Sequence, residues 1–86
     1  MKFRVFIEKK VLKQLEKFDE KTRDNLLNKF RELKHGFSPR LDIKKLKGFK
    51  NHYRLRIGNF RILFEIEDNK IIIYAILPRE KAYKKK

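Results

Sequence analysis

Three arginines stand close together in the stretch YRLRIGNFRIL, at positions 54, 56 and 61. Gly58-Asn59 between them suits a two-residue hairpin turn, because glycine accepts the positive φ that such turns require. This turn sets Arg56 directly opposite Arg61, and like charges in that position weaken a sheet by up to about 1 kcal/mol. Because arginine binds phosphate with a planar fork, we expect an anion between the two guanidinium groups. The alternative is that both side chains turn into solvent, where salt screens their repulsion.

Two further groups of side chains could carry chemistry on the same surface. In this register His52 faces Glu65, and a histidine beside a carboxylate can act as a general base. The pair lies four strand residues, or roughly 13 Å, from Arg56, so we favour a structural role for it. Arg79 and Tyr83 follow the last predicted strand, whose end lies near the arginines. A tyrosine can stack on a base or transfer a proton; the alternative is that Tyr83 anchors the tail on the sheet.

The N-terminal half contains the elements that must support these residues. Alternating apolar side chains in KFRVFI predict a strand over residues 2–7. Two apolar stripes at helical spacing predict helices within 9–18 and 20–36. Asp19 can cap the second helix, and Gly36 stands where a C-terminal glycine is expected. The short connection makes the two helices an antiparallel hairpin.

The C-terminal half is predicted as a basic loop and a three-stranded meander. Residues 37–51 contain Pro39 and Gly48 and show no clean period, so we expect mostly loop there. Gly58-Asn59 and Asp68-Asn69 divide the remainder into strands, and both residues of the second turn tolerate positive φ. The order β-α-α-β-β-β predicts an α+β domain in which the strand and helical hairpin of the N-terminal half pack on one face of a small antiparallel sheet.

Alternation along the meander divides its side chains between an inner and an outer face. The inner face is predicted to carry Tyr53, Leu55, Ile57, Phe60, Ile62, Phe64, Ile66, Ile71, Ile73, Ala75 and Leu77. The outer face carries the arginines and an apolar strip made of Leu63, Ile72, Tyr74 and Ile76. An apolar strip that no helix covers is typical of a binding surface. The alternative is that the C-terminal tail folds back over it.

Composition limits the class of partner. The 86 residues form one domain, 1–86, whose residues 84–86 we expect to fray, and the formal net charge is +14. Such a charge attracts polyanions: nucleic acid first, then an acidic membrane or an acidic protein. The alternative is lysine used for solubility, or the Lys- and Glu-rich composition common in thermophiles. The chain has no cysteine and no apolar run of about 20 residues, so we expect a cytoplasmic protein with no membrane partner, metal or cofactor.

The segment DIKKLKGFKNHYRLRIGNFRILFEIEDNKIIIYAILPREKAY resembles the RelE/ParE superfamily of toxins from toxin–antitoxin pairs. The features that carry the resemblance are KLKG, YRLRIGNFRILFEI and PREKAY in this order, and the N-terminal elements extend it over nearly the whole chain. It is most similar to the RelE branch, including its archaeal members. The resemblance implies a metal-independent endoribonuclease that cuts mRNA in the ribosomal A site, with the ribose 2′-hydroxyl as nucleophile.

The resemblance also implies roles for single residues. Arg61, the arginine of FRILF, would bind the scissile phosphate, and Arg54 and Arg56 match the basic pair of the preceding strand. Arg79 and Tyr83 match the C-terminal basic residue and aromatic, with spacing that varies among relatives. Three further lysines would bind ribosomal RNA: Lys44, Lys45 and Lys47. Lys81 could take the place of Arg79.

The partners implied by the resemblance are an acidic RelB-like antitoxin, the ribosome with its mRNA, and operator DNA reached only through the antitoxin. We expect the antitoxin to lie over the apolar strip or to add to a sheet edge. Three alternatives stay open: a ParE-like gyrase inhibitor without nuclease chemistry, a catalytically silent nucleic-acid-binding module, and a regulatory subunit that only tightens DNA binding by its antitoxin.

Overall fold

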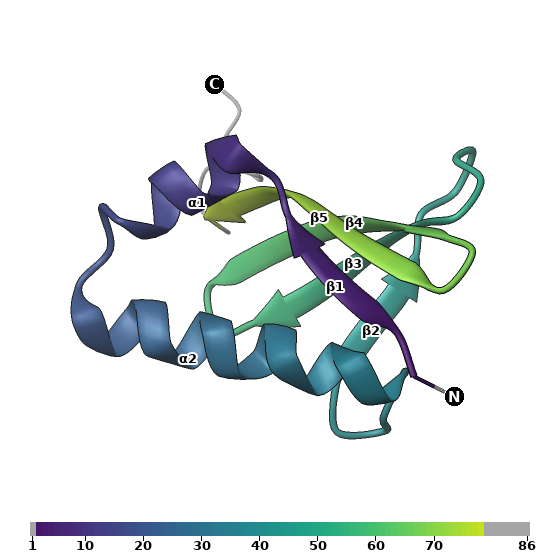
Figure 1. Ribbon diagram of the computed structural model, residues 1–86, viewed down its shortest axis with the longest axis horizontal. Helices are drawn as coiled ribbons and strands as arrows, with labels where there is room; N and C mark the ends of the chain where they lie inside the picture. The colour runs from purple at the N-terminus through teal and green to yellow at the C-terminus, as the bar shows by residue number, and fades with distance from the viewer. Residues whose placement is uncertain (1, 79–86) are drawn as a thin grey trace.

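The computed structural model describes residues 2–78 and contains five strands and two α-helices in one sheet-and-helix unit (Figure 1). The chain forms β1 (Arg4–Ile7), α1 (Lys9–Leu15), α2 (Glu20–Glu32), a short 3₁₀ turn (Leu33–His35), β2 (Asp42–Lys45), β3 (His52–Ile57), β4 (Phe60–Glu67) and β5 (Lys70–Pro78). This confirms the predicted α+β class.

The sheet is mixed, with strand order β1-β5-β4-β3-β2. Strands β2 to β5 pair antiparallel, whereas β1 pairs parallel with β5. The three C-terminal strands form the predicted antiparallel meander, whereas β1, which was predicted to pack on one face of the sheet, joins its edge instead. A strand that is followed by a helical crossover commonly returns parallel to its neighbour, and the helical hairpin lets β1 do so here.

Strand β2 lies inside the segment that the sequence predicts as mostly loop. Its four residues, DIKK, are exposed except for Ile43, so they give no alternating apolar signal. The strand exists because β3 offers its free edge: Ile43 pairs with Leu55, and Lys44 pairs with Arg54. Pro39 and Gly48, which mark the segment as loop, lie outside the strand.

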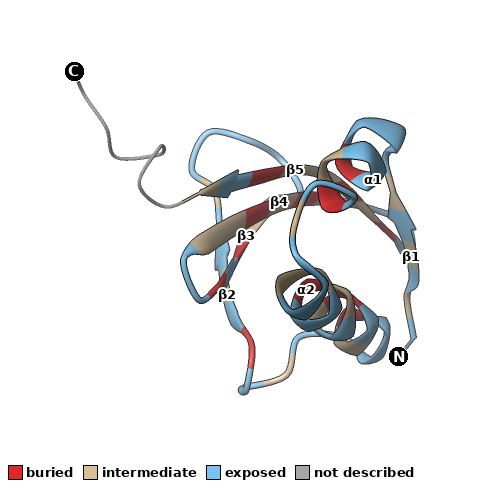
Figure 2. Ribbon diagram, turned by 90° about the vertical axis from the view of Figure 1, so that its left-hand side faces the viewer, coloured by how far each residue is buried: buried red, intermediate tan, exposed pale blue. Residues whose placement is uncertain are grey.

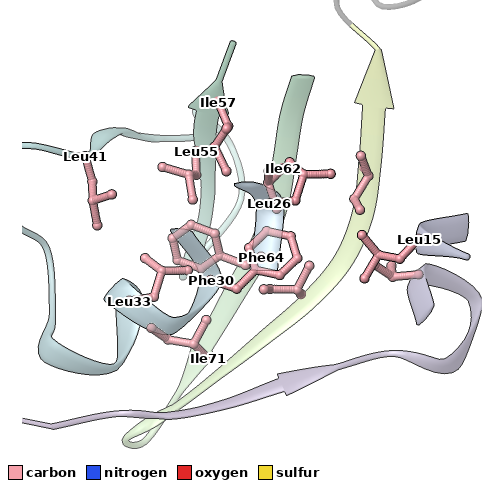
Figure 3. Close-up of a cluster of buried hydrophobic side chains, with 13 residues drawn as sticks. Leu15, Leu26, Phe30, Leu33, Leu41, Leu55, Ile57, Ile62, Phe64 and Ile71 are labelled. Atoms are coloured by element: carbon pink, nitrogen blue, oxygen red, sulfur yellow. The ribbon is translucent and has the colours of Figure 1, made fainter. Parts of the chain in front are cut away.

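The helices pack on one face of the sheet and enclose the core (Figure 2). Leu26, Phe30 and Leu33 from α2 and the turn after it are fully or almost fully buried with Phe64 of β4 (Figure 3). Helix α1 contributes Val11 and Leu15 to the same cluster. Asp19 stands before α2 in extended conformation, and Gly36 follows the 3₁₀ turn at φ 96°. Asp19 thus precedes the first residue of the second helix, and Gly36 ends the helical segment, where the sequence predicts.

The register of β3 on β4 follows the turn at Gly58-Asn59, where Gly58 has φ 56°. Ile57 pairs with Phe60, and Arg56 pairs with Arg61, as predicted. The second turn at Asp68-Asn69 also spans two residues and pairs Glu67 with Lys70. Only Asp68 takes a positive φ there, at 58°, so the turn differs from the type that the sequence suggests.

Strand β5 departs from simple alternation at a β-bulge. Leu63 pairs with Ala75 but Phe64 pairs with Ile73, which leaves Tyr74 as the extra residue. A bulge places two residues of one strand against one of its partner and shifts the alternation beyond it. Ile76 is consequently 2% exposed in the core, and Leu77 is 38% exposed on the outer face. The predicted places of Ile76 and Leu77 are both wrong for this reason, and so is the inner place of Ala75, which pairs with the outer residue Leu63.

Truncation at these two neighbouring positions tests the bulge. Ile76→Ala should lower the free energy of unfolding by about 2–5 kcal/mol, because it leaves a cavity in the core. Leu77→Ala, the matched control, should change it by only about 0.5 kcal/mol, as at most surface sites. Urea denaturation followed by circular dichroism measures both. The reverse ranking would show that β5 keeps the unbroken alternation.

Candidate functional site

The outer face of the sheet gathers basic side chains from three strands. Arg56 of β3 lies opposite Arg61 of β4. One row along the strands, Arg54 lies between Lys44 of β2 and Leu63 of β4. We name Lys44, Arg54, Arg56 and Arg61 the basic cluster. Because all four residues occupy positions of the same parity in paired strands, their side chains leave the sheet on the face that α2 does not cover.

Asp42 is the acidic neighbour of this cluster. It pairs with Arg56 across the β2–β3 ladder, and its Oδ2 lies 3.8 Å from Arg56 Nε. Both side chains are well exposed, so the ion pair contributes little stability. Arg56 thus stands between a carboxylate on one side and a guanidinium on the other. The sequence analysis missed Asp42 because it placed the residue in a loop.

Arg54 is held differently from Arg56. Its side-chain Nε is buried, and no residue of the described range 2–78 accepts a hydrogen bond from it. A buried donor without an acceptor costs about 1–3 kcal/mol. An anion that reaches this nitrogen would offset the cost. The buried Nε makes Arg54 a candidate anion-binding donor, and its cross-strand neighbour Lys44 places a second positive charge beside it.

The predicted lysines separate in the structure. Lys44 joins the basic cluster beside Arg54, whereas Lys45 pairs with Tyr53 and so points to the other side of the sheet at its exposed edge. Lys47 lies in the exposed loop between β2 and β3. The remaining predicted site residues, Arg79, Lys81 and Tyr83, lie outside the described residues. Strand β5 ends at Pro78 opposite Phe60, the residue before Arg61.

A second polar group occupies the other end of the outer face. His52 Nδ1 lies 2.9 Å from the Tyr74 hydroxyl, and His52 Nε2 lies 3.4 Å from Glu65 Oε1. In neutral His52, a tyrosine hydroxyl that donates to Nδ1 leaves the ring proton on Nε2, directed at the carboxylate. The pairing of His52 with Glu65 is as predicted. The contribution of Tyr74 was missed, because the sequence analysis assigned this residue to the apolar strip alone.

This second group is chemically distinct from the basic cluster. Burial raises the pKa of the Tyr74 phenol above its ordinary value, and the charge of Glu65 raises the pKa further. The phenol therefore stays protonated at neutral pH and works as a hydrogen-bonding group. His52 stands four residues, roughly 13 Å, from Arg56 along β3. One phosphate cannot contact both residues at that distance.

The apolar strip differs from the prediction in one residue. Leu63, Ile72 and Tyr74 are partly exposed on the outer face, and Ile76 is in the core. Leu77 takes the outer position instead, opposite Arg61. The corrected strip, Leu63, Ile72, Tyr74 and Leu77, therefore runs from the His52 group to the arginine pair.

The part of the chain that the structure describes contains neither a cluster of metal ligands nor a membrane-spanning helix. No group of three or more His, Cys, Asp or Glu side chains there could hold a metal ion. None of the helices in residues 2–78 is both long and apolar enough to cross a membrane.

Known proteins are similar to this chain in sequence and in fold. The sequence profile described as "ParE toxin of type II toxin-antitoxin system, parDE" matches residues 5–83. A putative toxin RelE1 of Methanocaldococcus jannaschii is 41% identical over an alignment of 92 residues that covers 98% of each chain. Toxin RelE3 of the same organism is 48% identical over 44 residues, and there the chain spans only 50% of the relative's length.

A solved structure agrees with the sequence matches. The archaeal RelE–RelB complex from Pyrococcus horikoshii OT3 contains a chain that superposes with a TM-score of 0.79 at 30% identity, covering 92% of this chain and 97% of that one. The fold and the sequence define a toxin of a type II toxin–antitoxin system. The chain belongs to the RelE/ParE toxin superfamily, on the RelE-type side with archaeal relatives.

The raised pKa of Tyr74 predicts how stability depends on alkaline pH. An unfolded phenol loses its proton near pH 10, whereas the folded phenol keeps it to higher pH. The unfolded state then binds fewer protons, so the free energy of unfolding falls as pH rises above about 10. Tyr74→Phe removes this contribution.

The measurement is urea denaturation of both proteins across about pH 9 to 11, where the linkage acts. We expect a shallower fall in the free energy of unfolding for Tyr74→Phe than for the parent. Near pH 7 the variant should be about 0.5–1.5 kcal/mol less stable, from the lost hydrogen bond to His52. Parallel pH profiles would contradict the role given to Tyr74.

Proposed function

We propose that this toxin is a ribosome-dependent endoribonuclease that cuts mRNA in the A site. The observation that carries the proposal is the pairing of Arg56 with Arg61 on the sheet face that the helices leave uncovered. Two guanidinium groups in facing positions form a site for one phosphate group, because each can donate two parallel hydrogen bonds to its oxygens. Family membership supports the reading, since RelE-type relatives are toxins.

The proposed reaction is an internal transfer within RNA. The ribose 2′-oxygen forms a bond to the adjacent phosphorus while the bond from phosphorus to the 5′-oxygen of the next nucleotide breaks. The products are a 2′,3′-cyclic phosphate and a free 5′-hydroxyl. The 2′-hydroxyl must lose a proton, and the departing 5′-oxygen must gain one. Negative charge accumulates on the phosphorane oxygens between these two events.

Arg54, Arg56 and Arg61 would stabilise that negative charge. Fixed cations aimed at charge that develops in the transition state are usually the largest single contribution to catalysis. They also bind the ground-state phosphate, so only the excess stabilisation of the transition state raises the rate. Arginine stays protonated in proteins and cannot accept the 2′-proton.

Proton transfer is assigned to Tyr83, with Arg79, or Lys81 in its place, as a further cation at the phosphate. An ordinary phenol has a pKa near 10, and neighbouring cations lower the pKa of a phenol by favouring its charged form. Arginines near Tyr83 would therefore increase the fraction of the phenol that is ionised at neutral pH and able to accept the 2′-proton. The His52–Glu65–Tyr74 group is too far from the phosphate for this task and keeps a structural role.

Contacts with ribosomal RNA would come from the overall charge. The net charge of +14 and the exposed lysines at 44, 45 and 47 favour a polyanion, and binding of this kind weakens steeply with salt. The toxin would act in the cytoplasm, where ribosomes are.

The proposed inhibitor is an acidic RelB-like antitoxin. The similar chain from Pyrococcus horikoshii was solved in complex with RelB, and the corrected apolar strip beside a strongly basic cluster suits an acidic, amphipathic segment. Such a segment would cover the arginine pair and the strip together. Operator DNA would be reached only through the antitoxin.

Removal of one guanidinium tests the phosphate site. Arg61→Ala should lower ribosome-dependent cleavage by about 10²–10³-fold, the usual effect of losing one charge-stabilising donor. Arg31→Ala is the matched control, because it removes the same charge from α2 on the other side of the sheet and should leave cleavage within about 2-fold. Primer extension on mRNA in a cell-free translation reaction measures both.

Two outcomes would contradict the proposal in different ways. If the parent toxin makes no ribosome-dependent cut, it is not a nuclease of this class, and a gyrase-directed or purely regulatory role takes its place. If the parent cuts and Arg61→Ala cuts equally well, the phosphate lies elsewhere on the protein.

The antitoxin proposal makes a separate prediction. The reading frame beside this one should encode a short, acidic, helical protein that copurifies with the toxin and stops cleavage. Leu77→Lys should weaken that complex at least about 10-fold by placing a charge in an apolar contact, whereas Leu12→Lys, at an exposed position of α1, should not. Titration calorimetry of the purified pair gives both affinities, and equal affinities would remove the strip from the interface.

A further inference from the structure

Phe49 is the most exposed large apolar side chain in residues 2–78, with 61% of its surface in contact with solvent. It lies in the loop between β2 and β3, which projects beyond the body of the protein (Figure 1). Its sequence neighbours are Gly48 and Lys50, and Lys47 stands one residue further back. An exposed phenylalanine among lysines adds nothing to the core and does not improve solubility. Its position therefore points to an external contact.

The loop that carries Phe49 is anchored at both ends. Leu46 N–H donates to the His52 carbonyl at 2.9 Å, and Ile66 N–H of β4 donates to the Asn51 carbonyl at 2.9 Å. Gly48 and Asn51 take positive φ values of 80° and 62°, which lets the chain turn tightly within a few residues. The backbone thus holds Phe49 at one place relative to the sheet.

The ring is also supported from the side. The Phe49 and His52 ring centroids are 5.8 Å apart at 57°, and those of His52 and Tyr74 are 5.5 Å apart at 73°. His52 in turn is fixed by the Tyr74 hydroxyl and Glu65. The group formed by His52, Glu65 and Tyr74 thus has a structural role: it fixes the position of the Phe49 ring beside it.

We propose that Phe49 is a stacking platform for an unpaired RNA base, flanked by Lys47 and Lys50 as phosphate contacts. This rests on the proposed function, which brings RNA to the same face of the sheet. An aromatic ring beside cations is the combination by which proteins hold single strands without reading sequence. His52, whose ring supports the platform, lies four strand residues or roughly 13 Å from Arg56, and Phe49 lies beyond it in the loop that precedes β3. The base held there is consequently not at the bond that is cut.

Base-dependent binding is the property that tests the platform. The probes are a fluorescent oligoribonucleotide of about ten residues and an abasic strand with the same number of phosphates. Phe49→Ala should weaken binding of the normal strand about 5- to 150-fold, the range for one stacked base. It should leave the affinity for the abasic strand unchanged. Phe49→Trp should retain binding. Leu12→Ala, which truncates an exposed apolar residue on α1, should affect neither strand.

A second pair of measurements separates stacking from charge and from loop damage. Lys47→Gln should weaken both strands equally and lower the slope of log affinity against log salt by about 0.7, whereas Phe49→Ala should leave that slope unchanged. Phe49→Leu keeps the apolar bulk without the ring and should behave like Phe49→Ala. Equal thermal unfolding curves show that the variants fold.

The proposal is overturned if Phe49→Ala binds the normal strand as well as the parent does, or if it loses both strands equally. It is also overturned if the parent binds neither strand, or if Phe49→Ala instead weakens binding of an acidic glutamate peptide, which would make Phe49 a protein contact. Failure of the proposed function looks different. In that case the normal strand still binds through Phe49, while translation reactions show no cut mRNA.

Discussion

The two-residue turn at Gly58-Asn59 is the constraint on which the outer face depends. It pairs Arg56 with Arg61, and a slip of one residue would exchange every inward and outward side chain of β3 relative to β4. The buried residues Leu55, Ile62 and Phe64 resist such a slip, because all are without solvent exposure. The hydrophobic core thus maintains an electrostatic arrangement that the sheet alone would disfavour.

The sequence was sufficient where one simple rule governs the chain. Alternation and a glycine turn gave the β3–β4 register, the facing arginines and the partnership of His52 with Glu65. The sequence was insufficient where contacts between distant segments determine the local backbone. The bulge that turns Ile76 inward depends on how β5 packs between β4 and the first helix, whose Gln14 donates a hydrogen bond to the Ile76 carbonyl at 2.8 Å. No periodicity in KIIIYAILP signals that interruption.

Pairing with β3 also accounts for strand β2, which carries Asp42 and Lys44 beside the arginines of β3. A strand of four mostly exposed residues has no apolar alternation to detect, and it forms because β3 has an edge to be paired. That pairing brings Asp42 to Arg56 and Lys44 to Arg54. The electrostatics of the candidate site therefore depend on a strand that local propensity does not specify.

The two outermost strands have a consequence for how copies of this protein meet one another. Strands β1 and β2 are each four residues long, and they carry Arg4 and the Lys44-Lys45 pair along the unpaired borders of the sheet. Short, cationic borders discourage strand-to-strand association between identical molecules. Positive charge on both edge strands therefore opposes fibre formation between copies of this protein. A negatively charged strand from another protein would not be repelled by these edges.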